Sequence, residues 1–356
     1  MYKIEDVSNF VKQVLIKIGC SEEDALLGAE VLMVAELRGI SSHGLMRLKD
    51  YVQLWEQKRI NTSPIIKITH ETPSTAVVDG DSGLGIVVAP RAMKIAIEKA
   101  KIAGTGWVAM NNSNHYSIAG YHAMMALEHD MIGISMTNAN PLVAPTFSVD
   151  RFLGTNPIAV AIPAGKYPPF VADFATTGIA RGKLDILAQK KQEAPDLFVQ
   201  DKYGKISKDP NVIKDGGALL PLGGDRLHGS NKGYCLGGIV DIFSAILSGA
   251  HFGPWVPPSV AFLPVKPKEG GLGTGHFFGA MRIDAFQTKE EFKTRMDEWI
   301  ETFKNARPAE GIERVMVPGE PEAEMEIKIR KEGIVILDKV LEDLKQLSEQ
   351  FEVKMF

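Results

Sequence analysis

The chain has 356 residues, which is long enough for two or three domains or for one large enzyme unit with insertions. Its 45% hydrophobic and 24% charged residues exclude a disordered, collagen-like or coiled-coil chain. The net charge of -4 comes without a basic block, so we expect no nucleic-acid partner and no membrane surface. Two cysteines are too few for a disulfide framework or a cysteine zinc site, and we expect no metal. No segment is typical of a signal peptide or a membrane span, which predicts a cytoplasmic protein.

The first 72 residues are predicted to be helical. Apolar residues at helical spacing occupy one face of residues 4–18. A Ser-x-x-Asp capping motif begins a second helix, over residues 21–39, which ends at a glycine. A third helix is predicted to begin at Ser42 and to continue through Trp55.

From residue 73 to 307, short β-branched runs alternate with helical stretches, which is typical of an α/β sheet. Residues 185–232 form a turn-rich insertion whose irregular spacing argues against an (βα)₈ barrel. A complete G-x-G-x-x-G turn is absent, so a bound dinucleotide would not use the standard Rossmann turn. Strands are predicted at 75–80, 106–110, 133–138, 157–163, 170–175, 260–265 and 276–284, and helices at about 86–103, 117–129, 234–249 (buried), 288–306 and 337–351.

The first candidate site lies in residues 38–47. If a helix begins at Ser42, His43 and Arg47 lie four residues apart and share a face. The imidazole can exchange a proton near neutral pH, the serine can hydrogen-bond it, and the guanidinium can bind a carboxylate through two parallel bonds. This combination suits a 2-hydroxy or 2-oxo acid. On spacing alone, a capping serine beside a surface histidine and arginine is the more common explanation.

Other candidates follow or precede predicted strands. The polar turn 111–117 contains His115 and follows a strand, where α/β sheets usually bind ligands. Thr155 precedes a strand, and Asp173 at the end of the next could accept from ribose hydroxyls. Lys232 at a helix start could attract a phosphate or a carboxylate. Taken alone, the turn with His115 is equally explained as an ordinary polar turn, Thr155 and Asp173 are weak signals, and Lys232 is better explained as a helix-end lysine.

Taken in order, seven motifs resemble the malate/L-lactate dehydrogenase family that lacks a Rossmann fold. That family includes sulfolactate and ureidoglycolate dehydrogenases and a cyclic-imine reductase. The similarity runs from about residue 4 to 351, so it covers nearly the whole chain. The motifs are RGISSHGLMR at 38–47, NHYS at 114–117, GISMTN at 133–138, GTNP at 154–157, DFATT at 173–177, KGY at 232–234 and VPGE at 317–320.

The resemblance implies a three-layer α/β/α structure with a mixed sheet that binds NAD or NADP. A helical domain would come from both chain ends, with residues 1–72 packing against 308–356. Residues 73–307 would form the cofactor domain, with the insertion at about 185–232. The resemblance also implies a homodimer.

The resemblance also implies roles for individual residues. His43 would donate the proton in reduction and accept it in oxidation, with Ser42 polarising it, and His115 is the alternative for this role. Arg47 would bind the substrate carboxylate, and Thr155 would lie beside the substrate. Positions matching the cofactor site are His115, Tyr116, Ser117, Ala119, Ala139, Asp173, Phe174, Ala175 and Lys232, together with Arg307, Gly311 and Arg314 in a later loop.

The reaction implied is hydride transfer between a nicotinamide and a small 2-hydroxy or 2-oxo acid, with malate and oxaloacetate first. Lactate, sulfolactate, ureidoglycolate or a cyclic imine acid are alternative substrates, and a non-catalytic NAD(P)-binding relative is an alternative of another class. Malate's second carboxylate needs another cation, for which Arg181, Lys183 and Lys232 are candidates. Tyr116 stands where several relatives have a small residue, so we expect it to narrow the substrate pocket.

Overall fold

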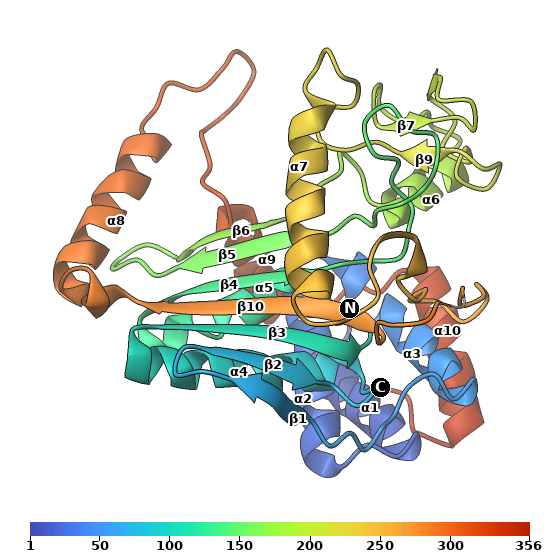
Figure 1. Cartoon of the computed structure of the whole chain (residues 1–356), viewed down its shortest axis with the longest axis horizontal. Helices are drawn as coiled ribbons and strands as arrows, with labels where there is room; N and C mark the ends of the chain where they lie inside the picture. Colours follow the sequence, from blue (N-terminus) through green and yellow to red (C-terminus); the bar gives the residue numbers. More distant parts are fainter. Residues whose placement is uncertain (267) are drawn as a thin grey trace.

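The computed structural model describes residues 1–266 and 268–356. Its first helices are α1 (Ile4–Lys17), α2 (Glu22–Leu37) and α3 (Met46–Glu56) (Figure 1). The predicted cap is present, because Ser21 Oγ accepts the Asp24 N–H at 3.1 Å. A short 3₁₀ turn, Ser41–His43, separates α2 from α3, so the prediction that the third helix begins at Ser42 is wrong.

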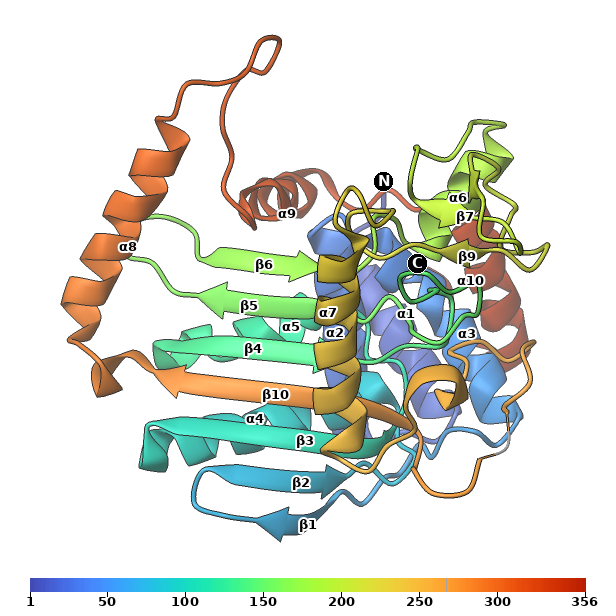
Figure 2. The same ribbon diagram turned by 45° about the horizontal axis from the view of Figure 1, so that its top comes forward.

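A seven-stranded mixed sheet forms the centre of the chain, in the order β1-β2-β3-β10-β4-β5-β6 (Figure 2). Only β2 and β3 pair in parallel, and the other neighbouring strands are antiparallel. The predicted mixed sheet is therefore confirmed. The strands are β1 (Lys67–Glu71), β2 (Thr75–Asp79), β3 (Thr105–Ser113), β4 (Met131–Thr137), β5 (Ile158–Ile162), β6 (Phe170–Phe174) and β10 (Thr274–Arg282).

Helices cover both faces of this sheet. On one face lie α4 (Gly85–Ala103) and the short α5 (Ala119–Met124), followed by a 3₁₀ turn, Leu127–His129. Across the other face runs α7 (Ser230–Asp241), continued by a π-helical turn, Ile242–Ile246 (Figures 1 and 2). The expectation of a buried helix at 234–249 is wrong, because one side of this helix is apolar and exposed.

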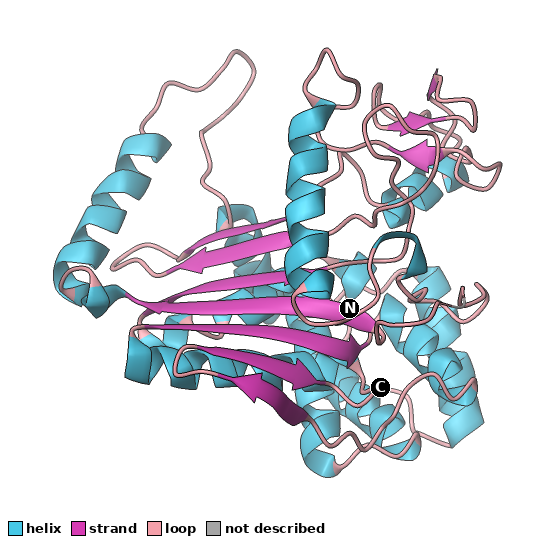
Figure 3. Ribbon diagram, in the orientation of Figure 1, coloured by secondary structure: helices cyan, strands magenta, loops and turns pink. Residues whose placement is uncertain are grey.

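The two chain ends share one hydrophobic core. It contains Phe10 and Tyr51 from the first helices and Leu344 from α10 (Asp338–Phe351). The two helices directly before α10 are α8 (Lys289–Lys304) and α9 (Glu320–Glu332), and the sequence did not predict α9 (Figure 3). Within the described residues, no helix has the length and hydrophobicity needed to cross a bilayer.

The predicted insertion is a small unit that follows β6, and its core also includes Val143 and Leu153 from the segment before β5. It holds α6 (Arg181–Gln189) and a three-stranded sheet of β7 (Val199–Gln200), β8 (Ile206–Ser207) and β9 (Ala218–Leu219). The strand predicted at 260–265 is wrong, because these residues form turns. Pro264 has no N–H for a strand ladder, and the Phe262 side chain is 66% exposed.

Candidate active site

Four of the candidate segments lie at one edge of the sheet. Strands β3, β4 and β6 run in the same direction, so their carboxyl ends lie together, on the side of the first helices (Figure 2). This edge carries His115 after β3, Ala139 after β4, Thr155 before β5 and Asp173 at the end of β6. The topology therefore gathers residues that are far apart in the sequence.

A buried carboxylate holds the turn that carries His43. Glu36, only 4% exposed, accepts the Leu45 N–H at 2.7 Å and the Ser41 hydroxyl at 2.8 Å. Gly44 is required between them, because a Cβ there would lie 2.3 Å from Glu36 Oε1. Burial raises the pKa of the Glu36 carboxyl, and its two hydrogen bonds oppose that shift. The chain is thus fixed to one carboxylate on both sides of His43.

Ser42, His43 and Arg47 do meet, but by a different route from the one predicted. Because α3 begins only at Met46, His43 and Arg47 do not share a helical face. Instead, Arg47 Nε donates to the Ser42 carbonyl oxygen at 2.8 Å. Ser42 Oγ lies 2.9 Å from His43 Nδ1. A hydrogen bond to the main chain therefore brings the guanidinium next to the imidazole and its serine.

His115 joins this group from the turn after β3. The His43 and His115 rings stack with centroids 5.6 Å apart. Tyr51 Oη lies 2.8 Å from His115 Nδ1, and Ser117 Oγ donates to the His43 carbonyl oxygen at 2.7 Å. Tyr51 was not predicted as a site residue, although its position four residues after Arg47 on α3 is a signal for it.

Burial determines the protonation of both imidazoles. It lowers the pKa of His43 to about 4, with the nearby Arg47 as the second cause. It also lowers the pKa of His115 well below the ordinary value, with His43 as the next cause. The Ser117 N–H points at His115 Nδ1 from 3.4 Å, and burial raises the pKa of Tyr51, which keeps its proton. His115 Nδ1 is therefore an acceptor, so the hydrogen of the neutral ring is on Nε2.

Arg47 keeps donors free for a ligand. Its Nη1 forms an ion pair with Asp50 Oδ2 at 2.9 Å, and its Nε bonds the Ser42 carbonyl. In the described part of the chain, no residue bonds its Nη2. Burial raises the pKa of the Asp50 carboxyl, and Arg47 opposes this shift. The open side of the guanidinium can therefore bind a carboxylate in the two-bond geometry typical of arginine.

The residues expected at the cofactor are partly engaged with the protein itself. Asp173 Oδ2 accepts the Gly120 N–H at 2.7 Å, which leaves the other oxygen available, and burial raises the Asp173 pKa to about 6. The Ala139 N–H donates to Asn156 Oδ1 at 3.0 Å. Lys232 is exposed in the first turn of α7, and its amine has no partner among residues 1–266 and 268–356.

Tyr116 lies in the core rather than beside the substrate residues. Its ring stacks on His276 at 4.6 Å and on His122 at 4.3 Å, and its hydroxyl lies 3.1 Å from Ser135 Oγ. The side chain is only 1% exposed. The expectation that it narrows a pocket beside His43 is therefore not met.

Thr155, Phe174 and Ala175 lie near one another where β5 begins and β6 ends. The Thr155 carbonyl accepts the Thr176 N–H at 2.8 Å, which joins the two segments. The Phe174 side chain is 40% exposed, and Ala175 is half-buried. Ala119 is buried at the start of α5. These positions surround the same sheet edge as His115.

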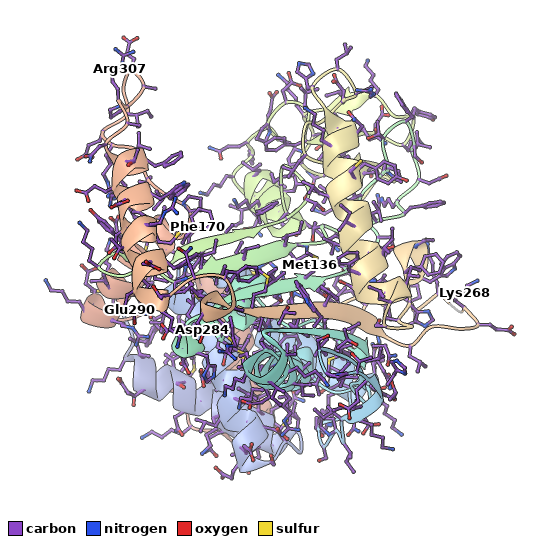
Figure 4. The ribbon with its side chains drawn as sticks, turned by 60° about the vertical axis from the view of Figure 1, so that its left-hand side comes forward. Met136, Phe170, Lys268, Asp284, Glu290 and Arg307 are labelled. Carbon is purple, nitrogen blue, oxygen red and sulfur yellow. The ribbon has the colours of Figure 1, made fainter. Side chains whose placement is uncertain are left out.

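The loop 305–319 is separate from the other candidates within one chain. Arg307 lies at its projecting tip, and Gly311 follows it (Figure 4). Arg314 bonds Glu320 at 2.9 Å and Glu324 at 2.6 Å. Among the described residues, no hydrogen bond or ion pair joins this loop to the two histidines. Nowhere in residues 1–266 and 268–356 do three or more possible metal ligands form a group.

Comparison with known proteins identifies the family to which the chain belongs. Residues 2–345 match the malate/L-lactate dehydrogenase family. The chain belongs to this family. It is 46% identical over 352 residues to the malate dehydrogenase of Pyrococcus abyssi, covering 98% of this chain and 94% of that protein. It is 41% identical to the L-sulfolactate dehydrogenase of Methanocaldococcus jannaschii, covering 98% and 96%.

A solved structure supports the same assignment. The malate dehydrogenase of Pyrococcus horikoshii OT3 is 42% identical and superposes with a TM-score of 0.90, covering 99% of this chain and 96% of that one. The predicted family and fold are therefore confirmed. The chain is an oxidoreductase of a 2-hydroxy acid dehydrogenase family, and such enzymes use a nicotinamide cofactor.

Proposed function

We propose that the enzyme transfers a hydride between NAD or NADP and a small 2-hydroxy or 2-oxo acid, with malate and oxaloacetate as the first pair. The observation that carries this proposal is the joined group of Ser42, His43 and Arg47, stacked against His115. The names of the relatives from Pyrococcus and Methanocaldococcus support malate and sulfolactate as the substrates to test first.

The polar groups near the sheet edge, both donors and acceptors, suit a nicotinamide dinucleotide. The unpartnered Lys232 amine would offset a phosphate, and the open oxygen of Asp173 would accept from a ribose hydroxyl. Thr155 adds a hydroxyl at the same edge. When bound, the nicotinamide supplies the hydride acceptor for oxidation of the alcohol. Contact between the cofactor and Arg307, Gly311 or Arg314 stays a prediction.

In the oxidation direction, His43 accepts the hydroxyl proton. It is neutral at pH 7, because burial and Arg47 lower its pKa to about 4. As Nε2 takes the proton, Nδ1–H donates to Ser42 Oγ, 2.9 Å away, which fixes the ring. His115 has its hydrogen on Nε2, so it suits donation to a substrate oxygen better than proton removal. This difference favours His43 as the base.

Arg47 binds the substrate carboxylate and so orients the reacting carbon. Its free Nη2 and the second hydrogen of Nη1 provide two parallel donors. The bound carboxylate also offsets the positive charge that helps to lower the pKa of His43. Substrate binding therefore increases the basicity of His43 when a base is needed.

A panel of 2-oxo acids tests the proposal. Oxaloacetate, sulfopyruvate, pyruvate and a cyclic imine acid are each assayed with NADH and NADPH, by the absorbance of the reduced coenzyme. L-malate and ureidoglycolate are assayed in the reverse direction. We expect oxaloacetate to give the highest kcat/KM. Absence of turnover with every acid and both coenzymes would refute the proposed reaction.

We further propose that the enzyme acts as a homodimer. The support is the exposed apolar side of α7 and its π-helical turn, which lies over the sheet. A contiguous apolar surface on a helix is typical of an interface. The cytoplasmic location also stays a prediction, based on the sequence.

A further inference from the structure

The insertion places an arginine next to the proposed proton-transfer pair. Gly182, the second residue of α6, passes so close to Ser42 that a Cβ on it would lie 3.9 Å from Ser42 Cβ. Arg181, the first residue of α6, directly precedes the glycine that approaches Ser42, the serine that contacts His43. Insertion and first helices thus meet at this point.

The guanidinium of Arg181 is weakly engaged by the protein. Its Nε lies 3.9 Å from Asp185 Oδ2, which is a long ion pair. Its Cζ lies 5.8 Å from the centre of the exposed Phe262 ring. Within the described residues it makes no hydrogen bond. Its five N–H donors are available to a ligand.

Arg181 acts on the same carboxylate as Arg47. Burial raises the pKa of Asp50, and the guanidinium groups of both Arg47 and Arg181 oppose that shift. Burial lowers the pKa of Arg151, and the positive charge of Arg181 adds to this effect. The guanidinium groups of Arg47 and Arg181 therefore both act on Asp50, whose pKa the negative charge of Asp343 also raises.

Two guanidinium groups near one carboxylate match a substrate with two acidic groups. In malate and sulfolactate, the carbon that is oxidised bears a carboxylate on one side and a methylene-linked carboxylate or sulfonate on the other. Arg47 binds the first carboxylate in the proposed function, on which this inference rests. We propose that Arg181 binds the second acidic group, a carboxylate or a sulfonate, and so selects two-acid over one-acid substrates.

The two lysines considered from the sequence are placed less well for this role. Lys183 is exposed and lies about 200° around the helix from Arg181. Lys232 lies in α7, where it is proposed to offset a cofactor phosphate. Arg181 is the cation whose charge acts on the Asp50 carboxyl, the ion-pair partner of Arg47.

Kinetics of Arg181→Gln with paired substrates test the proposal. We expect kcat/KM for oxaloacetate to fall by about 10- to 100-fold, mainly through KM, because a charge-assisted bond is lost. The value for pyruvate should be nearly unchanged, since pyruvate has no second acidic group. Arg181→Lys should recover part of the loss. Lys190→Gln is the control, because it removes a charge from an exposed position at the other end of α6. It should leave kcat/KM unchanged for both substrates.

Calorimetric binding of L-malate and L-lactate gives a second measurement that does not need turnover. We expect Arg181→Gln to weaken the binding of L-malate by the same factor and to leave the binding of L-lactate unchanged. Equal losses for both acids, or no loss for L-malate, would overturn the role of Arg181. Binding that discriminates as expected in an enzyme without turnover would support Arg181 and refute the proposed reaction instead.

Discussion

At the scale of single residues, the low pKa of His43 has a consequence that kinetics can measure. Burial and Arg47 lower this pKa to about 4, so the free enzyme holds the base form across the neutral range. We expect kcat/KM for oxidation to be independent of this group from pH 8 down to about pH 5 and to fall as pH approaches the His43 pKa. For reduction, which needs protonated His43, kcat/KM should fall as pH rises above that pKa.

The measurement is a pair of pH profiles, corrected for the fraction of the acid substrate that is ionised at each pH. Loss of oxidation near the ordinary histidine pKa, about 6.5, together with flat reduction up to that pH, would contradict the assignment. Arg47→Ala removes one cause of the lowered pKa, so the residual oxidation profile of this variant should move to higher pH.

Substitution should separate proton transfer from substrate binding. His43→Ala should lower kcat by about 10²- to 10⁴-fold, because the positioned base is lost, with little effect on KM. Arg47→Ala should mainly raise KM for the acid, because the two-bond carboxylate contact is lost. His115→Ala provides the comparison for the second histidine. A greater kcat loss in His115→Ala than in His43→Ala would assign proton transfer to His115.

The motif order could predict which residues form the site, but not how they meet. Ser42, His43 and Arg47 were found from residue types that suit an acid substrate. Tyr51 was missed because its hydroxyl contacts His115, which is 64 residues away. Glu36 was missed because its partners, Ser41 and Leu45, lie beyond the end of α2, in a turn that the sequence did not predict. Such contacts depend on tertiary structure, so local patterns do not contain them.

At the scale of elements, the turn between α2 and α3 depends on Glu36. Replacing Glu36 with Ala would leave the Leu45 N–H and the Ser41 hydroxyl without their acceptor. We expect the free energy of unfolding to fall by about 1–3 kcal/mol. We also expect kcat/KM to fall, because the 3₁₀ turn would no longer be held and His43, the proposed base, would be misplaced.

The conservative variant Glu36→Gln is the control. Its amide oxygen can accept the Leu45 N–H, and its NH₂ can donate to Ser41 Oγ, so it should restore most activity and stability. Both quantities are measured by denaturant unfolding and steady-state kinetics. Equal activity of the Ala variant and the unmodified enzyme would show that Glu36 does not position the turn.

Periodicity and composition predicted elements well where local pattern and tertiary contact agree. The helices at 4–18 and 21–39 and six strands of the central sheet were found within a few residues, but β1 (Lys67–Glu71) was missed, because residues 1–72 were predicted to be helical. The strand predicted at 260–265 failed because an apolar run without a neighbouring strand cannot form a ladder. The direction of pairing, antiparallel except between β2 and β3, is also not encoded in any one segment.

At the scale of the whole molecule, the proposed site lies between two bodies of structure. The first helices share a core with α10 from the other chain end, and this core also includes residues at the start of α4. The sheet edge bearing His115 faces this helical core through the contacts of Tyr51 and Ser117. Proton-transfer groups thus come from the helical part, and cofactor candidates come from the sheet.

The outward side of α7 and its π-helical turn is an apolar stripe, and its exposure to water is unfavourable. Its members recur at helical spacing, and small residues on the opposite side, such as Gly233 and Gly237, are buried. The stripe consists of Ile239, Ile242, Phe243, Ile246 and Leu247, with exposed fractions of 43%, 52%, 36%, 56% and 54%. We therefore expect a second copy of the chain to cover it.

Ile246→Glu should dissociate this dimer. A carboxylate buried without a partner would cost roughly 3 kcal/mol or more, which raises the dimer Kd by about 100-fold or more. Light scattering across a dilution series measures the change in mass. Ile102→Glu is the matched control, because Ile102 is 84% exposed at the end of α4, away from the stripe. A dimer that persists in Ile246→Glu, or one lost equally in both variants, would place the interface elsewhere.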